Sequence, residues 1–297
     1  MRLRLLVTGK QGQVVASMLE RAPPDIEIVA LGRPELDLAD PAAITCAFDN
    51  QTVDVVVNAA AYTGVDKAEA EESLATRING EGAGLVAAAA RRLGAPVIHL
   101  STDYVFDGQD HRPYREDDPT GPIGAYGRSK LAGEVAVAEA NPRHAILRTA
   151  WVYSPFGANF VKTMLRLGKT RDELSVVSDQ RGAPTSALDI ADAVFEVARG
   201  IVGDVAPRKF GVFHMTGAGE ASWAEFAAAI FHEAQRHGRA SVRILPILTR
   251  EYPTPARRPA NSRLDTARLA RDYGIRFPSW RDSLKPVVAR LLADEAT

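Results

Sequence analysis

The sequence predicts an α/β protein built on a doubly wound parallel sheet, with a smaller, partly discontinuous lobe in its C-terminal half. Apolar runs alternate with helical patterns through about the first 150 of its 297 residues, and such alternation is typical of a parallel sheet with helices on both faces. The run at residues 53–61 (VDVVVNAAA) is apolar without interruption, as expected for a strand that helices cover on both sides. After Trp151 the alternation becomes irregular, which indicates a second, smaller unit.

The first half contains five apolar runs that we interpret as strands, at residues 2–9, 26–32, 53–61, 96–106 and 144–153. Helical patterns separate them, at residues 13–22, from Pro41 onward, at 74–94 and at 126–140. Asp40 precedes Pro41, and this pair supplies an N-cap side chain and a first-turn proline. The pair therefore marks the beginning of the second helix.

The second half contains helical patterns at 159–169, 186–200 and 222–238, strand patterns at 173–179 and 211–217, and a tail rich in proline and arginine. No internal repeat is evident in it. We expect a sheet domain at residues 1–150, completed by about 171–205, and a smaller lobe at 151–170 and 206–297. The lobe is expected to close over the ligand end of the sheet.

Composition limits the classes of partner. The net charge of −1 gives no overall field that favours nucleic acid or an anionic membrane. The apolar stretch at the N-terminus stops at Thr8, too short for a signal peptide, and no run approaches the ~20 residues that span a bilayer. Cys46 is the only cysteine, which fits a reducing compartment. We therefore expect a cytoplasmic protein that binds a small molecule and neither nucleic acid nor membrane.

A glycine turn follows the first strand. Gly9 and Gly12 lie between this strand and the first helix, where glycines let backbone N–H groups approach a pyrophosphate at the positive helix end. The spacing is G-x-x-G, and Val15 stands where a third glycine is expected. In this β-α-β context we predict a dinucleotide site; a tight turn without a ligand is the alternative.

The end of the second strand bears on the choice of cofactor. NAD-specific sites usually place an acidic residue there, whereas a 2′-phosphate is better bound by arginine. The sequence has Arg33 and no carboxylate at that position, with Asp37 and Leu38 following where an adenine would rest. This arrangement favours NADPH, with NADH as the alternative, since Arg33 would also suit a solvated loop.

Three further residues predict proton-transfer chemistry. Thr102 ends a central strand, and Tyr126 and Lys130 are four residues apart in the next helical pattern, which places them on one face. A free phenol has a pKa near ~10, and a neighbouring ammonium favours the phenolate. Such pairs are also common on helix surfaces. Their order after the glycine turn, on the expected elements, favours catalysis.

These residues together resemble the extended short-chain dehydrogenase/reductases. Longer motifs narrow the resemblance to the dTDP-4-dehydrorhamnose reductase family, and they extend to about Asp265: VVNAAAYTGVDKAE, STDYVFDG, RTAWVYSPFGANFVKTML, SDQRGAPTSALDIA and YPTPARRPANSRLD. The resemblance implies a Rossmann-type dinucleotide-binding domain followed by a sugar-nucleotide lobe. It also implies reduction of the C4 ketone of dTDP-4-dehydro-L-rhamnose in dTDP-rhamnose biosynthesis.

Residue roles follow from the resemblance. Tyr126 would protonate the C4 oxygen, Lys130 would tune it and hold a ribose hydroxyl, and Thr102 would hydrogen-bond the same oxygen. The residues expected along the cofactor, besides Tyr126 and Lys130, are Gly9, Gln11, Gly12, Gln13, Val14, Arg33, Asp37, Leu38, Ala60, Ala61, Tyr62 and Thr63. Those expected at the sugar are Thr102, Asp103, Tyr104 and Trp151, and at the diphosphate Asn159, Lys162, Arg257 and Arg258.

No metal site is predicted. Some relatives carry a glutamate in the first helix that is linked to a metal-bridged dimer, and Mg²⁺ is associated with that type, but this sequence has Ser17 there. Its six histidines show no zinc spacing. We therefore expect either a monomer or a homodimer without a bridging metal.

Two alternatives to this reductase are considered. Related dehydratases carry an Asp-Glu pair after the threonine, whereas this sequence has Asp103-Tyr104, which favours ketone reduction over dehydration. A reductase or epimerase of another nucleotide sugar stays an alternative. The regulatory subunit of methionine adenosyltransferase belongs to the same family without catalysis of this kind. Loss of Tyr126 and Lys130 would favour that role, and both are present.

Overall fold

The computed structural model describes residues 2–49, 51–204 and 206–295. A six-stranded sheet with the order β10-β5-β4-β3-β1-β2 forms its larger part, and every pairing in it is parallel. The strands are β1 (Leu3–Thr8), β2 (Ile26–Leu31), β3 (Val55–Asn58), β4 (Val97–Thr102), β5 (His144–Thr149) and β10 (Gly211–His214). The strand order reverses between β1 and β3, and ligands bind at such a point, outside the carboxyl ends of the strands.

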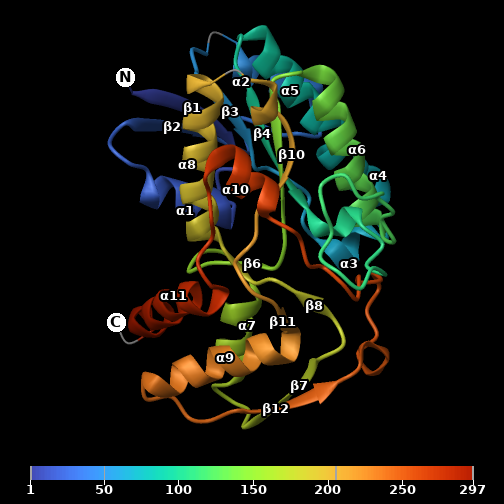
Figure 1. The fold of residues 1–297 in the computed structure, drawn as a ribbon, viewed down its shortest axis with the longest axis vertical. Coiled ribbons are helices and arrows are strands. Elements are labelled where there is room, and N and C mark those ends of the chain that lie inside the picture. The colour runs from blue at the N-terminus through green and yellow to red at the C-terminus, as the bar shows by residue number, and fades with distance from the viewer. Residues whose placement is uncertain (1, 50, 205, 296–297) are drawn as a thin grey trace.

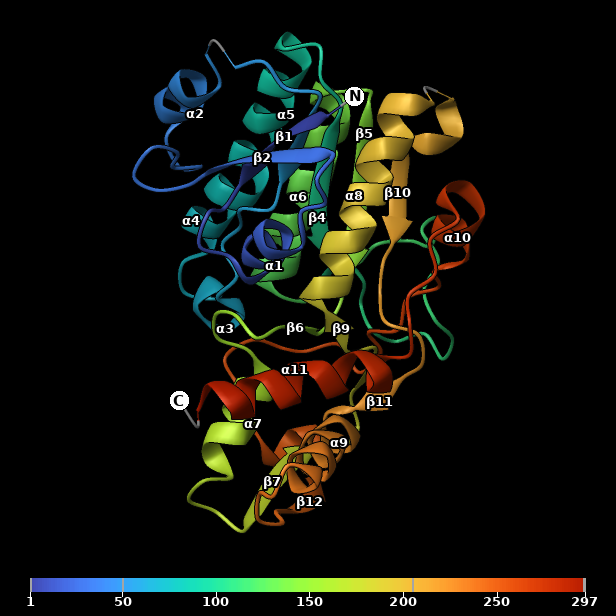
Figure 2. The ribbon, with the colours of Figure 1, turned by 90° about the vertical axis from the view of Figure 1, so that its left-hand side faces the viewer.

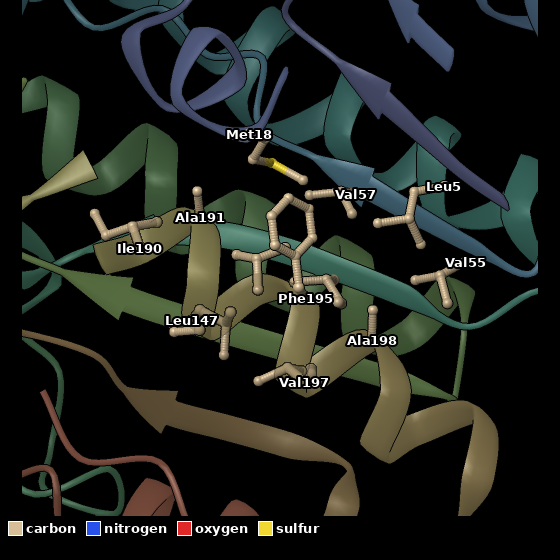
Figure 3. Close-up of a cluster of buried hydrophobic side chains, with 14 of the residues drawn as sticks. Leu5, Met18, Val55, Val57, Leu147, Ile190, Ala191, Phe195, Val197 and Ala198 are labelled. Carbon is tan, nitrogen blue, oxygen red and sulfur yellow. The ribbon is translucent and has the colours of Figure 1, made fainter. Parts of the chain in front are cut away.

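Helices cover both faces of this sheet (Figures 1 and 2). Successive strand residues point to opposite faces, so the uninterrupted apolar runs supply two cores. Leu5 packs with α1 and α8 on one face (Figure 3), whereas Leu6 packs with α2, α5 and α6 on the other. The helices are α1 (Gln13–Arg21), α2 (Pro41–Phe48), α5 (Ala83–Arg92), α6 (Ala125–Ala140) and α8 (Ala187–Gly203). The predicted α/β fold is confirmed.

The helical pattern at 74–94 is continuous but not uniform. It comprises α4 (Glu72–Thr76), a π-helical segment (Arg77–Gly82) and α5, preceded by the short α3 (Val65–Ala68). The π-helical segment lies against α6 at Gly133, where an added Cβ would come within 2.0 Å of the Asn79 carbonyl oxygen. Glycine at this position therefore lets the two helical segments approach closely.

The smaller lobe lies beyond the carboxyl ends of the strands, below the sheet in Figure 1. It consists of α7 (Phe160–Leu167), α9 (Trp223–Arg236), α11 (Trp280–Asp294) and the parallel pair β7 (Glu173–Val177) and β12 (Arg243–Ile247). Its own core includes Tyr153, Phe226 and Trp280, all buried. The lobe thus has a hydrophobic core of its own, separate from the two cores of the sheet.

Shorter elements complete the two parts. They are β6 (Val152–Tyr153) with β9 (Thr185–Ser186), β8 (Arg181–Gly182) with β11 (Ala221–Ser222), the 3-10 turns η2 (Asp103–Val105), η3 (Pro207–Lys209) and η4 (Thr249–Glu251), and α10 (Ala267–Tyr273). The β10 arrow points toward the lobe in Figure 2. The carboxyl ends of all six strands therefore face the junction.

The topology differs in part from the expected division. Strand β10, expected in the lobe, lies at the edge of the large sheet, and α10 packs on the same domain through Leu269. Strand β7 instead pairs with β12 in the lobe. The predicted boundary positions 205 and 297 lie outside the described residues. The proline-rich tail contains two elements that were not predicted, β12 and α11. They include Pro246 and Pro286, and proline inside a strand or helix usually indicates irregular structure.

Within the described ranges, no helix combines the length and the apolar character that crossing a bilayer requires.

Candidate active site

The glycine turn after β1 has the shape of an anion cradle. Gly9 has a φ of +96°, and its carbonyl accepts a hydrogen bond of 2.8 Å from the Gly12 N–H. A Cβ at Gly9 would lie 3.0 Å from the backbone of Ala60, so no larger residue fits. Helix α1 begins directly afterwards without a side-chain N-cap. Its first N–H groups are therefore available to a phosphate.

A cavity of about 280 Å³ adjoins this turn. It unites nine of the residues predicted to contact the cofactor: Gly9, Gln11, Gly12, Arg33, Asp37, Leu38, Ala60, Ala61 and Thr63. Lys10 also lines it and was missed by the sequence analysis, although its position between the two glycines was a usable signal. Arg33 and Lys10 form no ion pair with the described residues. Two cations at one cavity suit an anionic group.

Three other predicted cofactor residues do not line this cavity. The Gln13 side chain accepts a hydrogen bond of 3.1 Å from the Ser154 hydroxyl, which links the glycine turn to the lobe. The Tyr62 hydroxyl donates to Glu71 at 2.6 Å. Val14 packs on the sheet core. Contacts of these three residues with a cofactor remain predictions.

The three predicted catalytic residues meet at the end of β4. The Thr102 hydroxyl donates to Asp103 at 3.0 Å and accepts from the Tyr104 N–H at 3.2 Å. Tyr126 opens α6, and its ring packs edge-on against the Tyr104 ring with centroids 5.5 Å apart. Lys130 lies one turn later and is 2% exposed, and its ammonium donates to the Leu100 carbonyl at 2.6 Å.

Burial controls the protonation of these groups. It raises the pKa of the Tyr126 phenol, and the Asp103 carboxylate raises it further, while a hydrogen bond with Thr102 opposes the shift. The expectation that the pKa of Tyr126 lies below its ordinary value is wrong, because burial outweighs the opposing effects. The Lys130 ammonium, which was expected to lower this pKa, is bound by the Leu100 carbonyl. A phenol with a raised pKa carries its proton at neutral pH, as a proton donor must.

Burial also favours the uncharged forms of two neighbouring groups, Lys130 and Asp103. Burial lowers the pKa of Lys130 to about 8, against the attraction of Glu134. Burial raises the pKa of Asp103 to about 6, although hydrogen bonds from Ser262 and Thr102 oppose the change. The site thus holds two groups that titrate within two pH units of neutrality, and such groups are typical of functional sites.

Asn79 links the segment at Tyr62 with helix α6, and it is not among the residues predicted from the sequence. Its side chain accepts from the Tyr62 N–H at 2.7 Å and donates to the Tyr62 carbonyl at 3.0 Å. It also donates to Ser129 at 2.9 Å, and the Ser129 hydroxyl donates to the Tyr126 carbonyl at 2.7 Å. The signal available was the poor helix formers Asn79, Gly80 and Gly82 in a helical pattern.

Trp151 occupies the junction between the sheet and the lobe. Among the described residues it is the only non-glycine with positive φ, at +49°, a conformation that costs free energy and is concentrated at functional sites. Its ring stacks on Trp223 with centroids 3.6 Å apart. A Cβ at Gly182 would lie 2.4 Å from the same ring. Trp223 and Gly182 carried no signal that would pair them with Trp151, because they are far apart in the chain.

The residues predicted at the diphosphate differ in exposure and in their hydrogen-bond partners. Arg258 is half-buried and pairs with Asp66 at 2.8 Å, whereas Arg257 is exposed. Asn159 caps α7 by accepting from the Lys162 N–H, and the Lys162 ammonium donates to the Pro155 carbonyl at 3.2 Å. Contacts of these four residues with a diphosphate remain predictions.

Comparison with known proteins places this fold and site in a family. Residues 2–293 match the family model described as the RmlD substrate binding domain. The chain belongs to this family. A curated relative, the dTDP-4-dehydrorhamnose reductase of Sinorhizobium fredii, is 52% identical over 292 residues, covering 98% of this chain and 99% of the relative.

Solved structures of RmlD-type proteins share the complete fold. A dTDP-4-dehydrorhamnose reductase from Clostridium acetobutylicum has a TM-score of 0.91 at 39% identity and is matched along 98% of this chain and 100% of its own. The enzyme of the same name from Bacillus anthracis, solved in complex with NADP, has a TM-score of 0.90 at 35% identity with the same coverage. The family resemblance derived from the motifs is confirmed.

Position 17 carries no carboxylate: Ser17 is buried, and its hydroxyl donates to the Gln13 carbonyl at 2.8 Å. Among residues 2–49, 51–204 and 206–295, no group of three or more His, Cys, Asp or Glu side chains is arranged to hold a metal ion.

Proposed function

We propose that this chain reduces the C4 ketone of dTDP-4-dehydro-L-rhamnose to dTDP-L-rhamnose, with NADPH as the favoured reductant and NADH as the alternative. Family membership along nearly the whole chain supports this reaction. The observation that carries it is Tyr126, a phenol kept protonated beside the Thr102 hydroxyl at the edge of the sheet where the glycine cradle also opens. We place the reaction in the cytoplasm, in line with the single cysteine.

The cradle fits a dinucleotide because Gly9 turns the chain at positive φ directly before α1 and because the first amides of α1 carry no side-chain cap. The pyrophosphate would lie at Gly12 and the first turn of α1, and the adenine near Leu38. Arg33 and Lys10 would bind a 2′-phosphate, which is the basis for favouring NADPH over NADH. When bound, the cofactor supplies the hydride.

Tyr126 gives its proton to the C4 oxygen as negative charge develops there. Thr102 donates a hydrogen bond to the same oxygen, for which its hydroxyl turns away from Asp103. Lys130 holds a ribose hydroxyl and contributes positive charge that stabilises the tyrosinate left after transfer. Each of these roles is an interaction that strengthens in the transition state.

The sugar nucleotide would lie between the sheet and the lobe. We propose that Asp103, Tyr104 and Trp151 contact the sugar and that Asn159, Lys162, Arg257 and Arg258 approach the diphosphate. Arg258 and Lys162 would have to exchange existing bonds for this, because Arg258 is paired with Asp66 and Lys162 with a carbonyl. The active species is expected to be a monomer or a homodimer.

Absorbance of NADPH during incubation with dTDP-4-dehydro-L-rhamnose tests this proposal. The wild-type protein is expected to oxidise NADPH, and Tyr126→Phe to lose activity by about 100-fold or more, as for loss of a general acid. No oxidation by the wild type would contradict the reaction. Unchanged turnover in Tyr126→Phe would contradict the role of Tyr126 alone.

A further inference from the structure

A buried ion pair lies directly behind the catalytic lysine. Glu134 and Arg148 are 5% and 4% exposed, and their side chains form two parallel hydrogen bonds, of 2.9 Å from Nε and 2.6 Å from a terminal nitrogen. Glu134 belongs to α6 and Arg148 to β5. A fork of this kind, with both charges removed from water, is costly to form.

The pair anchors the catalytic helix to two strands of the sheet. The Ser101 hydroxyl of β4 donates to Glu134 at 2.5 Å, so the carboxylate is bound from both β4 and β5. The guanidinium of Arg148 also lies 5.0 Å from the centre of the Phe106 ring, which packs against its face. Every partner of the carboxylate is therefore fixed by the sheet or by the turn that follows it.

The same carboxylate adjoins Lys130. Tyr126, Lys130 and Glu134 follow one another at intervals of four residues, so they share one face of α6. Lys130 reaches the Leu100 carbonyl and Glu134 the Ser101 hydroxyl, which are successive residues of β4. The ammonium and the carboxylate thus end at neighbouring points on one strand.

The other charged or titratable groups near Lys130 do not replace this carboxylate. His99 of β4 is buried, and burial together with Lys130 lowers its pKa well below the usual value, so it carries no charge. Asp103 of η2 lies beyond Tyr126 at the strand end. Arg148 of β5 is positive. Glu72 of α4 and Glu69 are engaged elsewhere, with Arg128 and with the Ala125 N–H.

We propose that Glu134 is a positioning residue of the reaction, held by Arg148 and Ser101 so that its carboxylate keeps Lys130 in the ammonium form and in place beneath Tyr126. The inference rests on the proposed function only for its kinetic test. Lys130 is 2% exposed, and a buried amine without a nearby negative charge tends to lose its proton. The anchored carboxylate supplies that charge in a fixed position.

The test compares pH profiles of kcat/KM for wild type and Glu134→Gln. The alkaline limb is expected to move to lower pH by roughly one unit, so activity falls about tenfold at pH 9 and little at pH 6. Ser101→Ala removes one hydrogen bond to the carboxylate but keeps both charges, so its alkaline limb is expected to move by less than that of Glu134→Gln. An equal or larger shift in Ser101→Ala would contradict the role of the Glu134 charge. A purely structural role would lower stability without moving this limb.

Titration of the Lys130 Nζ resonance by NMR, assigned by its loss in Lys130→Met, gives the same information without turnover. It is expected to move to lower pH in Glu134→Gln. If the wild type lacks reductase activity, the proposed function fails, and this titration still decides the role of Glu134. An unmoved titration in the folded variant overturns the inference.

Glu134→Gln leaves Arg148 unpaired, so folding is checked first by thermal melting. Where it does not fold, Glu134→Gln/Arg148→Met, which also removes the unpaired guanidinium, is measured instead and is expected to shift in the same direction. If neither variant folds, the pair has a purely structural role and the proposal is overturned.

Discussion

The cofactor side and the substrate side of the site are built in different ways. The cavity beside the glycine turn is lined by residues at the ends of β1, β2 and β3, so consecutive β-α units form it and the order of the sheet brings it together. On the expected substrate side, Trp151 meets Gly182 and Trp223, and Arg258 pairs with Asp66. These contacts form only because distant segments pack. The first region follows from local sequence rules, and the second depends on long-range packing.

Substitution of Gly9 by alanine is expected to have the largest effect, and to act on the cofactor side. The new Cβ would meet the Ala60 backbone at 3.0 Å in a left-handed conformation. We expect kcat/KM for NADPH to fall by more than about 100-fold and the melting temperature to drop. Gly94→Ala is the matched control, because its φ is also positive but no atom lies within 4 Å. Equal losses in both variants would contradict a specific role of the turn.

Asp103 follows directly after β4. Its substitution by asparagine is expected to increase the free energy of unfolding of the protein. The pKa of Asp103 is about 6 in the folded protein against 3.8 in the unfolded chain, so the folded state holds the proton more tightly. The carboxyl therefore costs stability above pH 6 and costs nothing well below pH 3.8. We expect Asp103→Asn to raise the free energy of unfolding by up to about 3 kcal/mol at pH 8 and hardly at pH 3.

Urea unfolding at the two pH values measures this difference. Equal effects at both would show that the carboxyl is not the cause. Because Asp103 is also expected at the sugar, loss of turnover together with gain of stability would fit a residue retained for function.

Truncation of Trp223 to alanine is expected to act on the substrate side. It removes the ring on which Trp151 stacks, so we expect the KM for the sugar nucleotide to rise about tenfold and stability to fall by about 2 kcal/mol. The KM for NADPH should stay within twofold. Trp223→Phe keeps a stacking ring and should recover most of the loss. A change confined to the KM for NADPH would break the contrast between the two regions.

Replacement of Arg33 by alanine is expected to have the smallest effect. The guanidinium is exposed at the cofactor cavity, so its loss should reduce the ratio of kcat/KM for NADPH over NADH by about tenfold. Arg92→Ala, an exposed arginine at the end of α5, serves as the control and should leave the ratio unchanged. An unchanged ratio in Arg33→Ala would assign Arg33 to the solvated loop.

The sequence was sufficient for what periodicity and turn chemistry determine. The first five strands of the sheet, the Asp40 cap and the glycine turn follow local rules, and the structure has them where expected. It was insufficient where a residue's role depends on a distant partner. Lys130 was expected to lower the pKa of Tyr126, and only the fold shows that the Leu100 carbonyl binds its ammonium.

The elements and residues that were not predicted correctly also depend on distant partners. Strand β12 is recognisable through its pairing with β7, since its own sequence contains a proline. The edge position of β10 depends on β5, which lies far earlier in the chain. Asn79 acts through Tyr62 and Ser129, and neither partner is apparent from spacing.

The chain passes between the sheet domain and the lobe repeatedly: after β5, before α8, after β10, before α10 and before α11. An engineer who wished to alter substrate choice by grafting the lobe of a relative would therefore have to exchange several separate stretches in concert. A single cut would leave β10 or α10 on the wrong side of the splice. Transplantation of individual loops at the junction is the practical route for such chimeras.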